Sequence, residues 1–94
     1  YVSKYSKIGE GTMIMNSSII NSNSVIGKNC IINNNALIEH DVEIGDHSHI
    51  STSTTINGNV KIGKRSFVGS GSIIRESLNL KNDCFIKMGS ILKK

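Results

Sequence analysis

The stretch from Ile32 to Ser51 reads INNNALIEHDVEIGDHSHIS and places an isoleucine at every sixth residue. The spacing continues in both directions along the chain, and every position of the series is aliphatic. The series comprises Val2, Ile8, Ile14, Ile20, Ile26, Ile32, Ile38, Ile44, Ile50, Ile56, Ile62, Val68, Ile74, Leu80, Ile86 and Leu92. A period of six does not fit an α-helix. It is typical of a hexapeptide-repeat solenoid, in which each short strand directs one aliphatic side chain inward.

The residues between the aliphatic positions supply the turns. The third residue after each aliphatic one is mostly Gly, Asn, Asp or Ser, which tolerate the left-handed backbone region best. The fourth is nearly always small. Three hexapeptides make one triangular coil, and Gly9, Gly27, Gly45 and Gly63 repeat with the spacing of one coil. The sequence therefore predicts an all-β fold, a left-handed parallel β-helix of about five triangular coils with a height of roughly 25 Å.

Length and composition narrow the class of protein. The chain has 94 residues, 37% of them hydrophobic and 4% aromatic, which suits one small domain with an aliphatic core. No apolar run is long enough for membrane insertion, and no signal-peptide pattern is present. The net charge of +4 is too mild and too scattered to indicate nucleic acid, but it suits an anionic small ligand. Because the chain begins without Met and stops in mid-pattern, we expect 1–94 to be a single domain within a longer polypeptide.

The two cysteines share one column of the predicted prism. Cys30 and Cys84 both occupy the small inward position, three coils apart. That separation of roughly 14 Å is too large for a disulfide. We therefore expect reduced core cysteines and a cytoplasmic location.

The residue before each inward aliphatic one points outward, so these residues define three faces. Face A carries Tyr1, Ile19, Leu37, Thr55, Ile73 and Ile91; face B carries Lys7, Val25, Glu43, Lys61 and Asn79; face C carries Met13, Ile31, His49, Phe67 and Phe85. Faces A and C each show an apolar stripe, which indicates an interface. The pattern predicts a homotrimer in which face A of one subunit meets face C of the next. Coverage by flanking segments of the chain is the alternative.

His40 is the candidate for acid–base chemistry. It lies at the corner between faces A and B, with Asp41 after it and Gly58 one coil further along the same column. In acyl transfer, a neutral His40 takes a proton from an attacking amine or hydroxyl, and Asp41 orients the ring. The backbone N–H of Gly58 polarises the carbonyl of a thioester.

Three segments resemble the NeuD/PglD-like sugar acetyltransferases. They are the stretch quoted above, GNVKIG from Gly58 to Gly63, and FVGSGS from Phe67 to Ser72. The likeness extends over essentially the whole chain. It implies a trimeric left-handed β-helix enzyme that transfers acetyl from acetyl-CoA to an amino or hydroxyl group of a sugar or nucleotide-sugar.

The resemblance also assigns roles to single residues. His40 matches the general base and Asp41 the adjacent acid, and Gly58 matches the backbone donor to the thioester. These three roles agree with the chemistry expected from the residues themselves.

Four more residues have roles through the resemblance alone. Asn33 matches an asparagine that contacts the acceptor, and His49 a histidine that binds acetyl-CoA near the acetyl group. Ser70 and Met88 fall where the pantetheine arm of the cofactor packs, although Met88 replaces a usually small residue and narrows that groove. Because His40 ends face A while Asn33 and His49 lie on face C, we expect a composite site shared between subunits.

Enzymes of this group also carry an N-terminal αβ subdomain that grips the nucleotide-sugar and a C-terminal tail, and we expect both to lie outside these 94 residues. The late basic residues attract the phosphates of CoA in one interpretation and form a solvated basic end in the other. They are Arg75, Lys81, Lys87, Lys93 and Lys94.

Two other functions compete with acetyl transfer. A zinc site of the γ-class carbonic anhydrase type needs three convergent histidines, whereas His40, His47 and His49 occupy three different columns. We therefore predict no metal, and we interpret His47 as solvent-exposed. A non-catalytic scaffold, or an ice-binding prism with Thr ladders, is the second alternative, but it gives no reason to place Gly58 beside His40.

Overall fold

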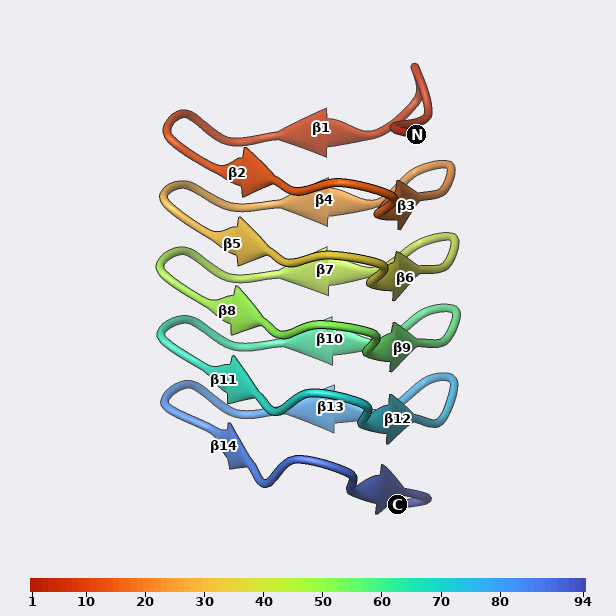
Figure 1. Ribbon diagram of the computed structural model, residues 1–94, viewed down its shortest axis with the longest axis vertical. Coiled ribbons are helices and arrows are strands. Elements are labelled where there is room, and N and C mark those ends of the chain that lie inside the picture. Colours follow the sequence, from red (N-terminus) through yellow and green to blue (C-terminus); the bar gives the residue numbers. More distant parts are fainter.

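The computed structural model describes residues 1–94 as a prism of short parallel strands without helices (Figure 1). Each face is one five-stranded parallel sheet. Face A contains β3 (Ile19–Ile20), β6 (Leu37–Ile38), β9 (Thr55–Ile56), β12 (Ile73–Ile74) and β15 (Ile91–Leu92). Face B contains β1 (Lys7–Ile8), β4 (Val25–Ile26), β7 (Glu43–Ile44), β10 (Lys61–Ile62) and β13 (Asn79–Leu80). Face C contains β2 (Met13–Ile14), β5 (Ile31–Ile32), β8 (His49–Ile50), β11 (Phe67–Val68) and β14 (Phe85–Ile86). The predicted left-handed β-helix of about five coils is confirmed.

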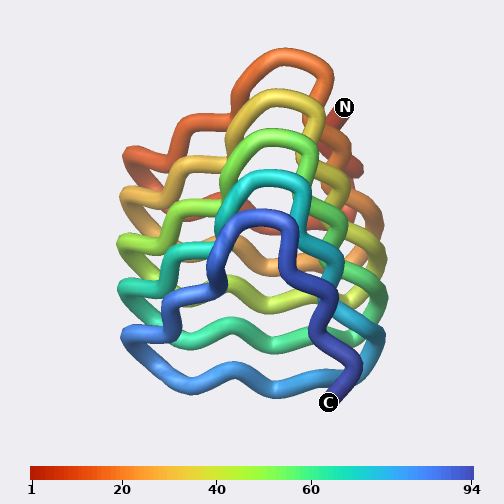
Figure 2. Tube along the Cα trace, turned by 60° about the horizontal axis from the view of Figure 1, so that its bottom comes forward, coloured from red at the N-terminus to blue at the C-terminus, as the bar shows by residue number.

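Successive coils stack in strict register. Ile32 of β5 pairs with Ile50 of β8, and Ile38 of β6 pairs with Ile56 of β9. The corners consequently lie above one another along the prism (Figure 2), whose longest dimension is 29 Å. We name each corner by the faces that it joins in chain order: His40 lies at the A–B corner, His47 at the B–C corner and Ser70 at the C–A corner.

In every turn from Gly11 onward, one residue adopts a positive φ, and it is always the third after an inward aliphatic residue. These residues are Gly11, Ser17, Asn23, Asn29, Asn35, Asp41, His47, Ser53, Asn59, Arg65, Gly71, Ser77, Asp83 and Gly89. Most are the residue types expected there. His47 and Arg65 are not, which shows that the stacked coils impose this conformation on whatever residue stands at the position.

The core is a stack of aliphatic side chains surrounded by polar corner residues. Ile32, Ile50 and Ile56 are completely buried, whereas Val2 of the same series is 41% exposed because it packs against a coil on one side only. Small hydroxyl residues link neighbouring coils: Ser24 Oγ accepts from the N–H of Val42 at 3.1 Å and donates to a backbone carbonyl.

Both cysteines are free, as the sequence predicts. Cys30 is buried in the core, and its thiol donates to the carbonyl oxygen of Gly45 at 3.2 Å. Cys84 is only partly buried, because it lies in the last coils, where fewer neighbours cover it.

The outer faces carry the residues assigned to them. Ile73 and Ile91 are exposed on face A, and Met13 and Phe85 on face C, with Phe85 72% exposed. Face B is more polar, and Oε2 of Glu43 on this face lies 3.8 Å from Nζ of Lys61. No helix of this structure could cross a membrane.

Candidate functional site

His40 lies in the turn after β6, at the A–B corner. Its Nδ1 is 2.9 Å from Oδ2 of Asp41, and the two side chains are 65% and 52% exposed. Asp41 is the positive-φ residue of this turn, with φ 59°. That contact directs the Nδ1 proton toward the carboxylate and leaves Nε2 free as a proton acceptor.

The imidazole of His40 lies against Gly58 of the next coil. A Cβ added to Gly58 would be 2.8 Å from Nε2 and 2.9 Å from Cε1 of the ring. The neighbouring N–H groups of the coil are used in the backbone ladder, Asn57 donating to Ile74 and Asn59 donating to His40, but the N–H of Gly58 donates to no group of the chain. The ring of His40 and Gly58 are therefore in contact, as the column spacing predicts, and the N–H of Gly58 is not used by the chain.

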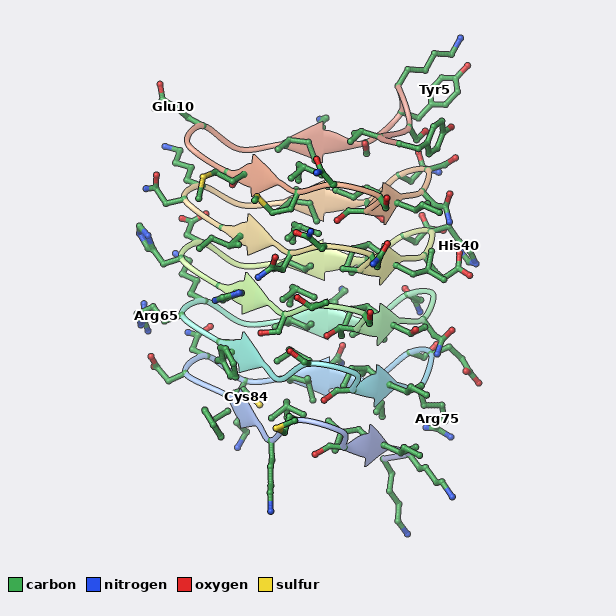
Figure 3. All side chains as sticks on the ribbon, in the orientation of Figure 1. Tyr5, Glu10, His40, Arg65, Arg75 and Cys84 are labelled. Carbon is green, nitrogen blue, oxygen red and sulfur yellow. The ribbon has the colours of Figure 1, made fainter.

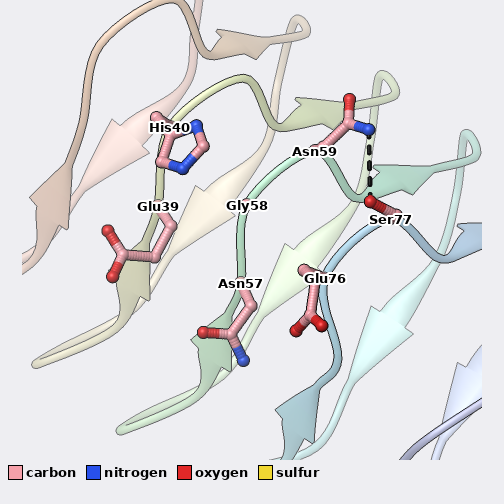
Figure 4. Close-up of a pocket in the computed structure, with 7 residues that line it drawn as sticks. All are labelled: Glu39, His40, Asn57, Gly58, Asn59, Glu76 and Ser77. Carbon is pink, nitrogen blue, oxygen red and sulfur yellow. Dashed lines mark hydrogen bonds between the residues drawn. The ribbon is translucent and has the colours of Figure 1, made fainter.

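A groove opens around this pair (Figure 4). Its volume is about 320 Å³, and it is lined by Glu39, His40, Asn57, Gly58, Asn59, Glu76 and Ser77, none of them hydrophobic. The sequence did not assign five of these residues to the site: Glu39, Asn57, Glu76 and the positive-φ residues Asn59 and Ser77. The spacing of one coil could have identified them, since Glu39 and Asn57 share one column, and His40, Gly58 and Glu76 share the next.

The groove has a negative lining although the chain has a net charge of +4. Glu39 and Glu76 are its charged residues, and no Lys or Arg lines it. Oε1 of Glu39 accepts from Nδ2 of Asn21 at 2.7 Å. The carboxylate of Glu76 makes neither a hydrogen bond nor an ion pair with the chain.

The structure brings Asn33 and His49 together on another part of the prism. Nδ2 of Asn33 lies 3.4 Å from Nε2 of His49. The His49 ring meets the edge of Phe67 at 5.4 Å between centroids, and Phe67 stacks on Phe85. His49 thus packs against the aromatic residues of the apolar stripe on face C.

Ser70 and Met88 share a column at the C–A corner, and both are exposed. They do not line the groove of His40, and neither do Asn33 and His49. Within one chain the predicted site residues therefore form two groups, one at the A–B corner and one around face C.

The B–C corner carries His47 and an ion pair. His47 is exposed, as predicted. Nε of Arg65 donates to Oδ1 of Asp83 at 2.8 Å, and this hydrogen bond, followed by the attraction of opposite charges, lowers the pKa of the Asp83 carboxyl and raises that of Arg65. The pKa of Asp46 is lowered by the hydrogen bond it accepts from the Lys28 N–H. The three histidines do not converge, and no cluster of three metal-ligating side chains occurs in the structure.

The whole chain, residues 1–94, matches the sequence model of the GMPPB C-terminal domain. A comparison with curated protein sequences finds no significant match.

Solved structures of sugar acetyltransferases are similar in fold and in sequence. PerB from Caulobacter crescentus, in complex with CoA and GDP-perosamine, is 30% identical with a TM-score of 0.98, and the match covers 99% of this chain and 45% of PerB. The acetyltransferase domain of PglB from Neisseria gonorrhoeae is 27% identical with a TM-score of 0.96, and the match covers 97% of this chain and 44% of that one. A second structure of the PglB domain, in complex with acetyl coenzyme A, has a TM-score of 0.85 at 27% identity and covers 96% of this chain and 49% of that one. The resemblance to hexapeptide-repeat sugar acetyltransferases is confirmed, and the chain spans less than half the length of these structures.

Proposed function

The chain belongs to the GMPPB C-terminal domain family, and from its site and its neighbours we propose that it transfers acetyl from acetyl-CoA to an amino or hydroxyl group of a sugar or nucleotide-sugar, with His40 as general base. Acetyl-CoA is the co-substrate, and the reaction needs no metal.

The observation that carries this proposal is the contact of His40 with Gly58. Nε2 of His40 faces the only glycine of its column, and the N–H of this glycine donates to no group of the chain. An acceptor placed there gives its proton to Nε2 as it attacks the thioester carbonyl. The Gly58 N–H stabilises the oxygen that becomes negative, and Asp41 stabilises the imidazolium. The imidazolium then protonates the leaving thiolate of CoA.

The similar structures support the same chemistry. The PglB domain was determined with acetyl coenzyme A, and PerB with CoA and GDP-perosamine. A perosamine N-acetyltransferase from Caulobacter crescentus was also determined with CoA and GDP-perosamine after one histidine had been replaced by asparagine or by alanine.

We also propose that the active site is completed between subunits of a homotrimer in the cytoplasm. Asn33, His49, Ser70 and Met88 lie away from the groove of His40 in one chain, so they reach it only from a neighbour. The apolar stripes of faces A and C, with Ile91 and Phe85 exposed, are the surfaces for that contact. In this arrangement His49 and Asn33 of one subunit bind the acetyl group and the acceptor beside His40 of the next.

The test is release of free thiol from acetyl-CoA with a panel of sugars and nucleotide-sugars. We expect His40→Ala to lower the rate by about 10²- to 10⁴-fold, the range for loss of a general base. His47→Ala is the matched control, because it removes an exposed histidine from another corner. Equal rates for wild type and His40→Ala would reject His40 as the base, and no thiol release with any acceptor would favour the non-catalytic scaffold.

The same assay examines the shared site. His40→Ala and His49→Ala proteins, each of low activity alone, should regain part of the activity when their subunits are mixed and exchanged. Confirmed exchange without recovery argues for a site within one chain, and a monodisperse monomer in sedimentation argues against the trimer.

A further inference from the structure

We propose that Asn57 is a site of spontaneous deamidation, in which the backbone nitrogen of Gly58 attacks the side-chain amide and the resulting succinimide opens to isoaspartate, which inactivates the site at His40. The loss of activity rests on the proposed function, whereas the modification itself does not. The reacting atoms belong to adjacent residues, so the reaction requires no contact across the groove.

The sequence points to residue 57 first. Asn57–Gly58 is the only Asn–Gly pair among the eleven asparagines of the chain. Asparagine is a thermally labile side chain. Its cyclisation is fastest before glycine, because glycine has no Cβ to hinder the approach of its own nitrogen. Three other asparagines precede the larger serine, namely Asn16, Asn21 and Asn23.

The attacking nitrogen is free in the structure. The N–H groups before and after Gly58 donate to carbonyls of neighbouring coils at 3.1 and 3.0 Å, but the N–H of Gly58 itself donates to no group of the chain. At the same turn position of the B–C corner, side-chain oxygens accept from the N–H groups of Lys28 and Lys64, each at 2.8 Å. No hydrogen bond within the chain therefore has to break before the Gly58 nitrogen reacts.

The leaving amide of Asn57 is held by a single bond and is open to water. Its Nδ2 donates to the carbonyl oxygen of Ile74 at 2.9 Å. Asn57 and Gly58 both line the groove of about 320 Å³ (Figure 4). Because one water needs only about 10–15 Å³, this polar groove admits water to the succinimide. The bond to Ile74 makes the reaction slower than in an unfolded chain but does not block it.

The reaction balances with water as the only co-reactant. In the first step, the Gly58 nitrogen gives up its proton and bonds to Cγ of Asn57, while the Cγ–Nδ2 bond breaks and ammonia leaves with that proton. In the second step, water adds to one of the two carbonyl carbons of the ring. Opening at the main-chain carbonyl gives isoaspartate, whose backbone runs through Cβ and Cγ, and opening at Cγ gives aspartate.

Isoaspartate lengthens the backbone directly before Gly58. It inserts one carbon, about 1.5 Å of chain, into a turn that is stacked in register on its neighbours. Gly58 then shifts against the imidazole of His40, where an added Cβ would already be 2.8 Å from Nε2. A misplacement of about 1 Å lowers a rate roughly 10²-fold. A chain with isoaspartate at 57 should therefore lose nearly all of its activity.

Aspartate at 57 is the milder product, because the backbone keeps its length. Its carboxylate replaces the amide that donates to Ile74. Arg75 follows one coil further in the same column, and Figure 3 shows it on the same edge of the prism as His40. The guanidinium offers the new carboxylate an opposite charge. We therefore expect Asn57→Asp to stay more active than the isoaspartyl protein.

The test follows the ageing of the purified protein. Mass spectrometry measures the gain of one mass unit per deamidation, electron-transfer fragmentation locates it and separates isoaspartate from aspartate, and thiol release from acetyl-CoA measures activity. We expect the gain at Asn57 to outpace that at every other asparagine. It should be faster at pH 9 than at pH 6, because the attacking nitrogen must lose its proton. The activity that is lost should match the isoaspartyl fraction.

Two variants separate this loss from general decay. Asn57→Gln keeps an amide but would have to close a six-membered ring, which forms far more slowly, so it should hold its own starting activity. Asn16→Gln is the matched control, because it removes an exposed asparagine before Ser17, and it should age as wild type does.

Several results would overturn the proposal. They are a mass gain at other asparagines alone, a decline of Asn57→Gln in parallel with wild type, and full activity of the isoaspartyl protein. Equal inactivity of Asn57→Asp and the isoaspartyl protein would reject the longer backbone as the cause. If wild type releases no thiol with any acceptor, the acetyltransferase proposal fails, and the mass measurement still decides whether Asn57 is the site of deamidation.

Discussion

Glycines occupy the B–C corner and the A–B corner for different reasons. At the B–C corner, a Cβ on Gly45 would lie 2.5 Å from the backbone nitrogen of Lys64, and one on Gly63 would lie 2.3 Å from that of Asn82. At the A–B corner, the three atoms nearest to a Cβ on Gly58 all belong to the ring of His40. The first contact is with the backbone of the next coil, and the second is with a side chain alone.

The columns themselves show the same difference. At the B–C corner, the first residue after the inward aliphatic one is Gly9, Gly27, Gly45, Gly63 or Lys81, so it is glycine wherever the next coil packs on it. At the A–B corner, the second residue after the inward aliphatic one is Lys4, Ser22, His40, Gly58 or Glu76, so the fold accepts long side chains at this position. Gly58 is thus not required by coil stacking, and its value lies in the space that it leaves for His40 and a ligand.

Gly58→Ala should have the largest effect, and on activity alone. The methyl group displaces the imidazole, and a misplacement of about 1 Å is enough to lower the rate roughly 10²-fold. Because Gly58 has no positive φ and the nearest contacts of an added methyl group are with a side-chain ring, the stability of the protein should be unchanged or higher by up to about 1 kcal/mol. Thiol release and thermal unfolding measure the two effects, and an active Gly58→Ala protein would remove the geometric basis of the site.

Gly45→Ala should give the opposite pattern. The methyl group must push apart the backbones of two coils, and we expect unfolding to become easier by about 1–3 kcal/mol, as for an overpacked core. In a chain of this length each kcal/mol lowers Tm by roughly 4–8 °C. The rate per folded molecule should stay at the wild-type value, since Gly45 lies away from the groove. A Tm equal to that of wild type would contradict the distinction between the corners.

The smallest effect concerns the ion pair that also lies at the B–C corner. Because Arg65 holds the pKa of Asp83 below its usual 3.8, the ionised Asp83 stabilises the fold above that pH. This contribution is lost as the pH falls through the lower pKa of the folded protein. Urea unfolding at pH 6 and near pH 2 should show that acid lowers the free energy of unfolding less for Asp83→Asn than for wild type. The His40 groove plays no part in it, so both proteins should transfer acetyl equally at neutral pH.

The period of six was sufficient to predict the fold, because each inward position needs an aliphatic side chain and each turn needs one residue with positive φ. The same period placed Gly58 beside His40, and the structure confirms their contact. Arg65 and His47 at positive-φ positions were not predictable from residue preference, since the stacked coils override it there.

The composition of the groove was harder to predict. Glu39 and Glu76 are unremarkable as single residues, and their convergence depends on the column spacing together with the direction of each side chain. Asn33 and His49 lie apart from His40 within one chain, so the shared site that we propose would depend on a second chain. Sequence periodicity describes contacts along the prism but not contacts between prisms.

The strict stacking of the coils limits which changes of length the molecule can accept. Removing six residues between His40 and Gly58 would turn everything after the cut by one face, so that another residue would stand beneath the imidazole although every strand still found a partner. Removing or adding eighteen residues would keep every residue on its face, but the imidazole of His40 would then pack against a residue from a different coil. Insertions and deletions can therefore abolish the chemistry of such a prism while leaving it folded. Only substitutions can alter the groove at His40 without moving the residues that line it.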